Sequence, residues 1–412
     1  MTQRRVLVFN HFAVSPGYPG GTRHVELFSR LPGTSYTIIA GRRNLITGLP
    51  QRVEPGFRLV AVTPYRGNGL GRVVNWASYA VTATVAGLRQ PRPDVVFASS
   101  PHLLAALSGW VVATVRRTPF VLEIRDLWPR VLVDMGTLSE TSLAYRALER
   151  LERFLYRRCD RVVIMAPGIR AALEAKGVAP EKIAYIPNAA DPEDFVPGAD
   201  RDELRRRYGF TRRTAVYAGA HGPANGLDLL LDAAAAVPEI DVVLVGSGVE
   251  KSRLRAAAHD MRNIRFLDPV PKTEIPDLLH AADVGVHVLA DVELFRAGVS
   301  PNKVFDYMAA GLPIVTNSPG IVGDLVLGAG AGHVTPPTHL AHGLTQMLQA
   351  SPDELAKMGA AGRRWIRANQ SRTAMARALG ELLASLLEDE GRTRSWPAAA
   401  QSGPPPADVA GS

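Results

Sequence analysis

The sequence predicts an α/β protein built from two doubly wound parallel sheets, and three observations support this expectation. Short, almost wholly apolar runs alternate with amphipathic helical stretches, the pattern of parallel strands buried on both faces. The alternation stops at a turn-rich stretch after residue 190 and then restarts. A chain of 412 residues is also too long for a single hydrophobic core.

Residues 1–190 are expected to form one Rossmann-like domain, because strand and helix patterns alternate throughout this half. The predicted strands are Arg5–Phe12, Tyr36–Ala40, Arg58–Val62, Asp94–Ser99, Phe120–Ile124, Arg161–Met165 and Ile183–Ile186. The predicted helices are Thr22–Arg30, Val73–Leu88, His102–Val115, Leu143–Arg158 and Gly168–Lys176.

The second half is expected to repeat this arrangement over residues 213–370, after a linker at 191–212 that includes the polar run 200–207. Its predicted strands are Thr214–Ala218, Asp241–Val245, Ile264–Leu267, Val284–Val288 and Ile314–Thr316. Its predicted helices are Leu227–Ala236, Val249–His259, Thr273–Ala281 and Lys303–Ala309. Residues 371–390 should form a helix that returns to the first domain, and the Pro- and Ala-rich residues 391–412 should be disordered. Two such domains would face each other across a cleft at the carboxyl ends of their strands, where ligands bind in such sheets.

Cysteine content and hydropathy indicate in which compartment of the cell the chain is expected. Cys159 is the only cysteine, which excludes a disulfide framework, and we interpret it as a structural thiol. The longest apolar stretch, about 103–115, is shorter than the roughly 20 residues that span a bilayer. We therefore expect a cytoplasmic protein that associates at most peripherally with the inner face of the cell membrane.

Charge is divided unevenly between the two halves. Residues 1–190 carry 25 Lys and Arg against 12 Asp and Glu, a net charge of +13, whereas the remainder carries 22 against 27. A solvated arginine-rich surface and a surface for an anionic partner explain this equally well. We expect an anionic membrane as the partner, with no nucleic acid. The membrane-facing residues would be five arginines of one predicted helix and two aromatic residues of another: Arg146, Arg150, Arg153, Arg157, Arg158, Trp76 and Tyr79.

Two motifs in the first half could contribute to a site. Gly20 and Gly21 leave the first predicted strand and enter a helix, where a ligand phosphate could approach the backbone. The segment Glu123–Pro129 places Glu123, Arg125 and Asp126 at the carboxyl end of a buried strand, where charges are costly unless they are paired or used. Ion pairing of Arg125 with Glu123 or Asp126 is the alternative to a role at the cleft.

Two glycine-rich loops in the second half also follow predicted strands. The first, 217–227, contains Gly219, His221, Asn225 and Gly226, whose backbone or polar groups could contact a pyrophosphate, although His221 could equally be a packing residue. The second, Val245–Gly248, contains Gly246 and could equally be a tight corner.

The segment Ala297–Val315 is the most specific signal in the chain. Ser300 is predicted to cap a helix begun by Pro301, followed by Asn302. The free N–H groups at that helix end suit a phosphate, and Lys303 adds a point charge. Asp306 lies on the same helix face three residues later, where its carboxylate could accept both hydroxyls of a ribose.

This segment, together with Ile186–Asp191 and Val245–Gly248, resembles the retaining glycosyltransferases of family 4, which have the GT-B fold. The resemblance covers about residues 4–388. Residues Glu123–Pro129 and Ser300–Met308 further resemble the bacterial subgroup that adds amino sugars to surface-polysaccharide precursors. The resemblance implies a hexosyl- or N-acetylaminosugar-transferase that uses a UDP-sugar. Its acceptor hydroxyl would belong to a lipid-linked glycan precursor or a soluble glycan. It also implies that neither a metal nor another cofactor is needed.

The resemblance also implies roles for individual residues in the second half. Asp306 stands at the second acid of the family's Glu-x7-Glu motif, which holds the donor ribose, whereas the first acid falls at Gly298 and is missing. Residues 300–303 would bind the diphosphate with the loop 219–226. That loop lacks the family's Arg and Lys, so Lys303 or Arg296 would supply the charge. Val270 and Pro271 match the turn that holds the nucleobase.

In the first half, the Gly20–Gly21 turn matches the loop that faces the donor phosphates. Arg125 stands where the family often has a histidine near the donor sugar, and Asp126 follows it. Arg125, Asp126 and Lys303 are the expected catalytic residues.

Two alternatives remain open. A nucleotide-sugar 2-epimerase on the same fold would need acid/base groups at the cleft, for which Glu123, Asp126 and His102 are candidates. The second alternative is a subunit that binds a nucleotide sugar without catalysis, and its best support is the missing first acid.

Overall fold

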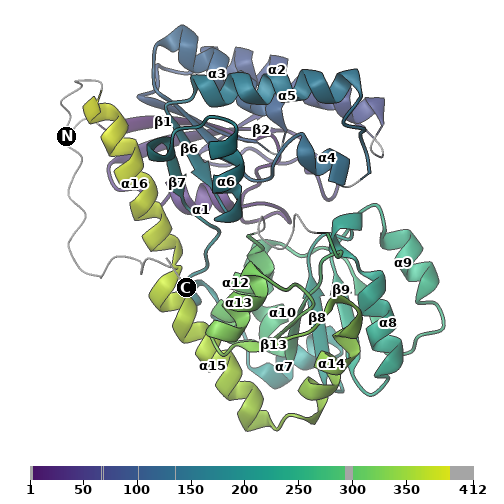
Figure 1. Cartoon of the computed structure of the whole chain (residues 1–412). Helices are drawn as coiled ribbons and strands as arrows, with labels where there is room; N and C mark the ends of the chain where they lie inside the picture. Colours follow the sequence, from purple (N-terminus) through teal and green to yellow (C-terminus); the bar gives the residue numbers. More distant parts are fainter. Residues whose placement is uncertain are drawn as a thin grey trace.

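The computed structural model describes residues 3–65, 67, 69–100, 102–134, 136–292 and 300–389, and within them the chain forms two parallel sheets. The predicted architecture of two doubly wound Rossmann-like domains is confirmed (Figure 1). Predicted strand and helix ends lie within three residues of the observed ones. Residues 391–412, together with Arg296 and Gly298, lie outside the described residues.

The first domain is built on a seven-stranded sheet. In spatial order its strands are β3 (Phe57–Val60), β2 (Thr34–Gly41), β1 (Arg4–Phe9), β4 (Val95–Ser99), β5 (Phe120–Ile124), β6 (Arg161–Ile164) and β7 (Ile183–Tyr185). One face packs against α2 (Leu70–Leu88), α3 (Leu103–Arg116), α5 (Leu143–Arg158) and α6 (Gly168–Ala175). The other face packs against α1 (Arg23–Phe28) and α16 (Arg372–Asp389). Between β5 and α5 the chain forms the short helix α4 (Arg130–Asp134).

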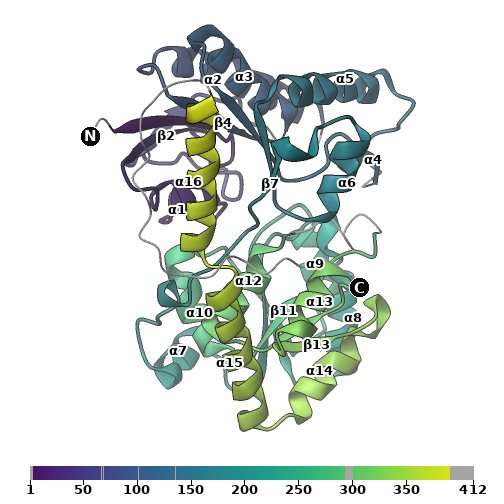
Figure 2. The ribbon, with the colours of Figure 1, turned by 60° about the vertical axis from the view of Figure 1, so that its left-hand side comes forward.

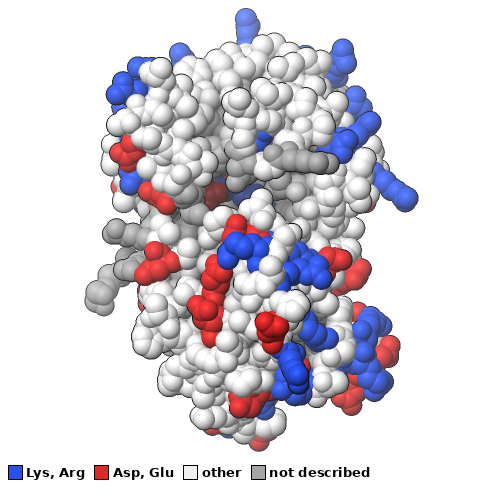
Figure 3. Space-filling view, turned by 90° about the vertical axis from the view of Figure 1, so that its right-hand side faces the viewer, with Lys and Arg blue, Asp and Glu red and all other residues white. Residues whose placement is uncertain are grey.

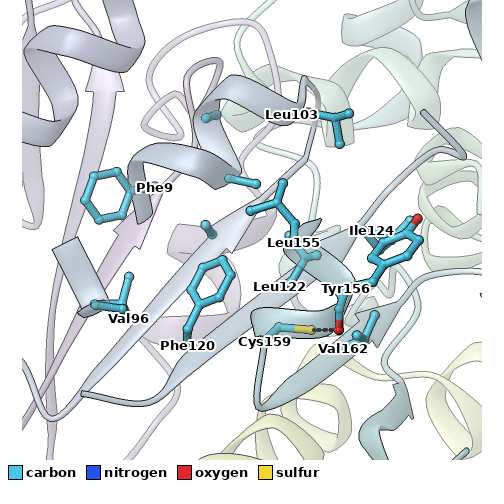
Figure 4. Close-up of a cluster of buried hydrophobic side chains, with 14 of the residues drawn as sticks. Phe9, Val96, Leu103, Phe120, Leu122, Ile124, Leu155, Tyr156, Cys159 and Val162 are labelled. Atoms are coloured by element: carbon cyan, nitrogen blue, oxygen red, sulfur yellow. Dashed lines mark hydrogen bonds between the residues drawn. The ribbon is translucent and has the colours of Figure 1, made fainter. Parts of the chain in front are cut away.

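Figure 4 shows part of the core between this sheet and its helices. Phe9 and Phe120 from the sheet lie in one cluster with Leu103 of α3 and Leu155 of α5, and none of the four is more than 2% exposed. Burial of each such side chain contributes about 1.5–3 kcal/mol relative to exposure. Cys159 follows α5, and its Sγ donates a hydrogen bond to the carbonyl oxygen of residue 156 at 3.3 Å. Burial raises the pKa of this thiol to about 12, so it stays protonated at neutral pH.

The second domain is built on a six-stranded parallel sheet. Its order is β10 (Ile264–Leu267), β9 (Asp241–Val245), β8 (Thr214–Ala218), β11 (Val284–His287), β12 (Ile314–Thr316) and β13 (Gly332–Val334). One face packs against α8 (Asp228–Ala236), α9 (Lys251–Ala257) and α14 (Leu340–Gln349). The other packs against α7 (Arg201–Tyr208), α10 (Ile275–Ala281), α12 (Asn302–Ala310), α13 (Ile321–Gly328) and α15 (Pro352–Asn369).

Helix α7 and strand β13 were not predicted. Residues 201–208 lie in the segment expected to be linker, but Asp200 caps them as a helix by accepting a hydrogen bond from the N–H of Glu203 at 2.8 Å. Leu204 then anchors that helix in the core with no exposed surface. Because most other residues of α7 are charged, its one buried leucine produces no hydrophobic repeat that would predict a helix from the sequence.

The chain returns to the first domain at its end. Helix α15 packs on α12 of the second domain, and α16 continues onto the first sheet beside α1 (Figure 2). Met375, Leu379, Leu383 and Leu386 recur every three or four residues along α16 and are at most 7% exposed. This spacing places an apolar stripe against the sheet, so α16 ties the two domains together.

Candidate functional site

A cavity of about 630 Å³ lies between the two domains. Its walls come from the β1–α1 loop and the end of β5 in the first domain, and from the loops after β8 and β9, the end of β11 and the start of α12 in the second. The predicted residues that border it are Gly20, Gly21, Arg125, Asp126, Gly219, Asn225, Gly246, Val270, Ser300, Pro301, Asn302, Lys303 and Asp306. Parallel strands of both sheets end here, so the topology alone brings these distant segments together.

Three predicted residues do not border the cavity. His221 has no exposed surface and lies between the rings of Tyr217 and Phe266, at centroid distances of 6.0 and 6.1 Å. Burial, followed by the charges of neighbouring lysines, lowers its pKa to about 4, so it is neutral. Gly226 (φ +53°) lies against the backbone of Ala290, where an added Cβ would meet its Cα at 2.9 Å. Pro271 stands next to Val270, which does line the cavity.

Lys303 lies in the first turn of α12 and reaches toward the loop after β8. Its Nζ is 2.9 Å from the hydroxyl oxygen of Tyr217, 3.4 Å from the Oδ1 atom of Asn225 and 4.1 Å from the centroid of the Tyr217 ring. Within the described residues it pairs with no carboxylate. Burial lowers its pKa to about 7. A partly buried cation that lacks a carboxylate partner at a cavity wall attracts an anionic ligand.

Ser300 does not cap α12, so that prediction is wrong. The cap position is taken by Pro301, which has no hydroxyl, because the helix begins one residue later than the sequence suggests. The Oγ of Ser300 instead accepts a hydrogen bond from the backbone N–H of Asn188 at 3.1 Å. Ser300 therefore joins the segment between the domains to the wall of the cavity.

Asp306 is 9% exposed and is surrounded by cations. The Nζ of Lys272 lies 2.5 Å from one carboxylate oxygen, and an Nη atom of Arg372 lies 3.8 Å from the other. Arg372 also pairs with Glu26 of the first domain at 3.0 Å and with Asp194 at 2.7 Å. Lys272 and Arg372 therefore hold this carboxylate in one orientation.

Lys272, Arg372 and Glu26 were missed by the sequence reasoning, although all three line the cavity. Lys272 directly follows the Val270–Pro271 turn, so its position next to a predicted contact was a usable signal. Arg372 left no such signal, because only the return of α16 to the first domain brings it to Glu26 and Asp306.

A buried ionic cluster supports the first-domain wall. Glu123 has no exposed surface and binds the Nε of Arg23 at 2.8 Å, the Nε2 of His24 at 2.9 Å and the hydroxyl of Ser99 at 2.7 Å. Burial alone would raise the pKa of Glu123, but Arg23, His24 and Arg125 together hold it well below its usual value. Glu123 therefore has a structural partner in Arg23.

Arg125 is left at the cavity wall because Glu123 is bound by other groups. A Cβ added to Gly21 would lie 3.9 Å from an Nη atom of Arg125, so the guanidinium lies against the Gly20–Gly21 turn. Asp126 follows it and is exposed at the same wall. Arg23 also donates to the carbonyl oxygens of Ile186 and Pro187, at 2.6 and 2.7 Å, which ties this wall to the segment that leaves the first domain.

The outer surface of the first domain differs from the sequence-based picture. Tyr79 has no exposed surface and donates a hydrogen bond to the carbonyl oxygen of Ile39 at 2.7 Å, so its predicted role at a membrane is wrong. Trp76 stacks on His102 at a centroid distance of 5.2 Å. The exposed face of α2 carries aliphatic residues instead: Leu70 at 84%, Val73 at 48%, Val74 at 53%, Val81 at 65% and Val85 at 42% exposure.

The five arginines of α5 are exposed, and α5 and α2 both pack on α3. Arg153 pairs with Glu149 at 3.0 Å along the helix. Figure 3 shows Lys and Arg around the outer margin of the first domain, with some Asp and Glu beside them on one side, and both signs of charge on the second domain. Among the described residues, no helix is long and apolar enough to cross a membrane, and no three His, Cys, Asp or Glu side chains gather in a metal-binding arrangement.

Comparison with known proteins gives consistent matches over both domains. Residues 20–189 match a family model described as a glycosyl transferase 4-like domain, and residues 212–350 match one described as glycosyl transferases group 1. The chain is 28% identical over 253 residues to the "Probable glycosyltransferase WbjE" of Pseudomonas aeruginosa, an alignment that covers 60% of this chain and 62% of that protein. It is 26% identical over 278 residues to the GDP-mannose-dependent alpha-mannosyltransferase of Mycobacterium tuberculosis, covering 67% and 69%.

One solved structure with the same fold is Alr3699/HepE of Anabaena in complex with UDP-glucose. It superposes with a TM-score of 0.69 at 17% identity and covers 92% of this chain and 99% of that one. The chain thus spans a little under two thirds of WbjE but nearly all of a two-domain structure of this fold.

Proposed function

Because this chain belongs to the glycosyltransferases with a 4-like first domain and a group 1 second domain, we propose that it transfers a sugar from a UDP-sugar to an acceptor hydroxyl with retention of configuration. The observation that carries the proposal is the pair of groups on α12. Lys303 offers a cation that no described carboxylate neutralises, and Asp306 offers an oriented carboxylate three residues later. The two together suit the diphosphate and the ribose of one nucleotide.

The donor would span the second-domain wall. The nucleobase lies at Val270, the ribose hydroxyls bind Asp306, and the diphosphate lies between Lys303 and the turns at Gly219 and Gly246. Only glycine fits at position 246, because any Cβ there would lie 1.9 Å from the carbonyl oxygen of Gly219. The same absence of side chains lets phosphate oxygens approach the backbone.

The proposed chemistry depends on stabilising the leaving group. Lys303 and the first-turn N–H groups of α12 offset the charge that develops as the nucleoside diphosphate departs. The acceptor hydroxyl then attacks the face from which the diphosphate left, with Arg125 and Asp126 beside the sugar. This front-face route needs no protein nucleophile.

The test is a donor screen followed by product analysis. UDP-, GDP- and TDP-sugars are compared by thermal shift, since a true donor raises the melting temperature by mass action. The preferred donor is then incubated with and without a glycan acceptor, and the anomeric configuration of the product is read by NMR. Transfer with retention supports the proposal. An epimerised nucleotide sugar without acceptor supports a 2-epimerase, and binding without turnover supports a non-catalytic subunit.

For the acceptor we propose a lipid-linked glycan precursor reached at the inner face of the cell membrane. The apolar face of α2 and the exposed arginines of α5 support this assignment, because a basic residue near an anionic surface contributes about 1 kcal/mol. Anionic vesicles should therefore pull the protein down in sedimentation at low salt and release it at high salt. Replacing Arg150 and Arg157 by Gln should weaken this sedimentation. A protein that stays in the supernatant at low salt would indicate a soluble acceptor.

A further inference from the structure

A fully buried histidine at the end of β11 borders the cavity and has no role in the scheme above. His287 has no exposed surface, and its Nδ1 lies 2.8 Å from the Oγ1 of Thr316 on the neighbouring strand. Its Nε2 has no hydrogen-bond partner within the described part of the chain. A buried polar nitrogen without a hydrogen-bond partner destabilises the folded protein by about 1–3 kcal/mol. An unpartnered nitrogen beside a cavity therefore indicates that a ligand binds there.

The hydrogen bonds of Thr316 determine which ring nitrogen of His287 carries the proton. The hydroxyl oxygen of Thr316 accepts the backbone N–H of Ser318 at 3.1 Å. Its own proton has one acceptor among the described residues, the Nδ1 of His287. A hydroxyl that donates to Nδ1 leaves the hydrogen of a neutral imidazole on Nε2. The open nitrogen of His287 is therefore a donor, which suits an anionic oxygen.

The charges around His287 favour the same ligand. Burial, followed by the positive charge of Lys303, lowers its pKa well below the usual range, so the ring is neutral near pH 7. Lys303 of α12 is the charged group whose field reaches His287. An oxyanion placed here would meet that cation and a neutral donor.

We propose that the Nε2–H of His287 donates a hydrogen bond to the distal phosphate of the donor diphosphate, beside the ammonium of Lys303. This inference rests on the proposed donor site. Lys303 precedes Asp306 by three residues of helix, or about 4.5 Å of rise. A ribose at Asp306 therefore brings the proximal phosphate toward Lys303 and the distal phosphate beyond it, toward the end of β11. Thr316 is then a positioning residue, because its hydroxyl sets the tautomer of His287.

The experiment compares UDP with UMP, which lacks the distal phosphate, by isothermal titration of the whole chain. In His287→Leu the affinity for UDP should fall about tenfold or more, whereas that for UMP should change less than about twofold. His287→Gln retains an N–H donor and should recover part of the lost UDP affinity. Thr316→Val removes the hydroxyl that sets the tautomer of His287. It should therefore lower the ratio of UDP affinity to UMP affinity, by a smaller factor than His287→Leu does.

The outcomes separate this inference from the proposed function. If wild-type protein binds UDP and transfers sugar while His287→Leu and His287→Gln keep the wild-type affinity ratio, the inference is wrong and the proposed function stands. Equal losses for UDP and UMP would assign His287 a structural role, and would also overturn it. If wild-type protein binds neither UDP nor GDP, the donor site itself is wrong. Circular dichroism and melting temperature confirm that each variant is folded before titration.

Discussion

Replacing Asp306 by Asn tests the ribose contact, because the amide keeps the side chain's shape while removing its charge. The carboxylate is 9% exposed, and one oxygen lies 2.5 Å from the Nζ of Lys272. Asn retains one acceptor oxygen, so about one charge-assisted hydrogen bond to the ribose is lost. Such a bond contributes roughly 1.5–3 kcal/mol, and every 1.4 kcal/mol is about tenfold in affinity. UDP affinity should therefore fall roughly ten- to a hundredfold.

The effect on folding should be smaller. Lys272 keeps 21% of its side chain in water and can be solvated when its partner is lost, so about 1 kcal/mol of stability is at stake. That corresponds to roughly 2–4 °C in melting temperature for a domain of this size. Isothermal titration with UDP and a thermal melt measure the two effects separately.

The matched control is Asp324→Asn, which removes an acid from the first turn of the nearby helix α13. Asp324 is exposed and does not line the cavity, so UDP affinity should not change. The reasoning is refuted if Asp306→Asn binds UDP within about threefold of wild type, or if the control loses as much affinity.

Three further predictions follow from the charges at and behind the cavity. Lys303→Met should weaken binding of free UDP, whereas Arg125→Met should lower turnover with little change in UDP affinity; equal losses of affinity would refute this division of roles. UDP affinity should decline as pH rises above about 7, because Lys303 loses its proton there while the terminal phosphate (second pKa about 6) stays fully ionised. Titrations at several pH values should show this slope in wild type and not in Lys303→Met. Glu123→Gln should lower the free energy of unfolding by about 3–5 kcal/mol, because it leaves the Arg23 guanidinium buried without its anion. Urea unfolding measures this loss, and a change below about 1 kcal/mol would show that the cluster is not a structural support.

The sequence by itself determined the fold class, because strand and helix periodicities depend only on residues near in the chain. Strands such as Phe120–Ile124 and Thr214–Ala218 were predicted at their observed ends, since buried parallel strands are continuous apolar runs. The same local reasoning singled out Lys303 and Asp306, which are one helical turn apart. It failed at α7, whose single buried leucine carries no periodic signal, and at Ser300, whose hydrogen bond goes to the distant Asn188 rather than to its own helix.

Only the tertiary structure decided which charges meet. Glu123 binds Arg23, 100 residues earlier, in place of the Arg125–Glu123 pair that was the alternative to a role at the cleft, and Arg125 lines the cavity. Arg372 joins Glu26, Asp194 and Asp306 because α16 returns to the first domain. His287 gained its candidate role because strand pairing sets Thr316 beside it. Ion pairs and tautomers depend on which side chains come within about 3 Å, and that distance is set by how strands and helices pack rather than by their spacing in sequence.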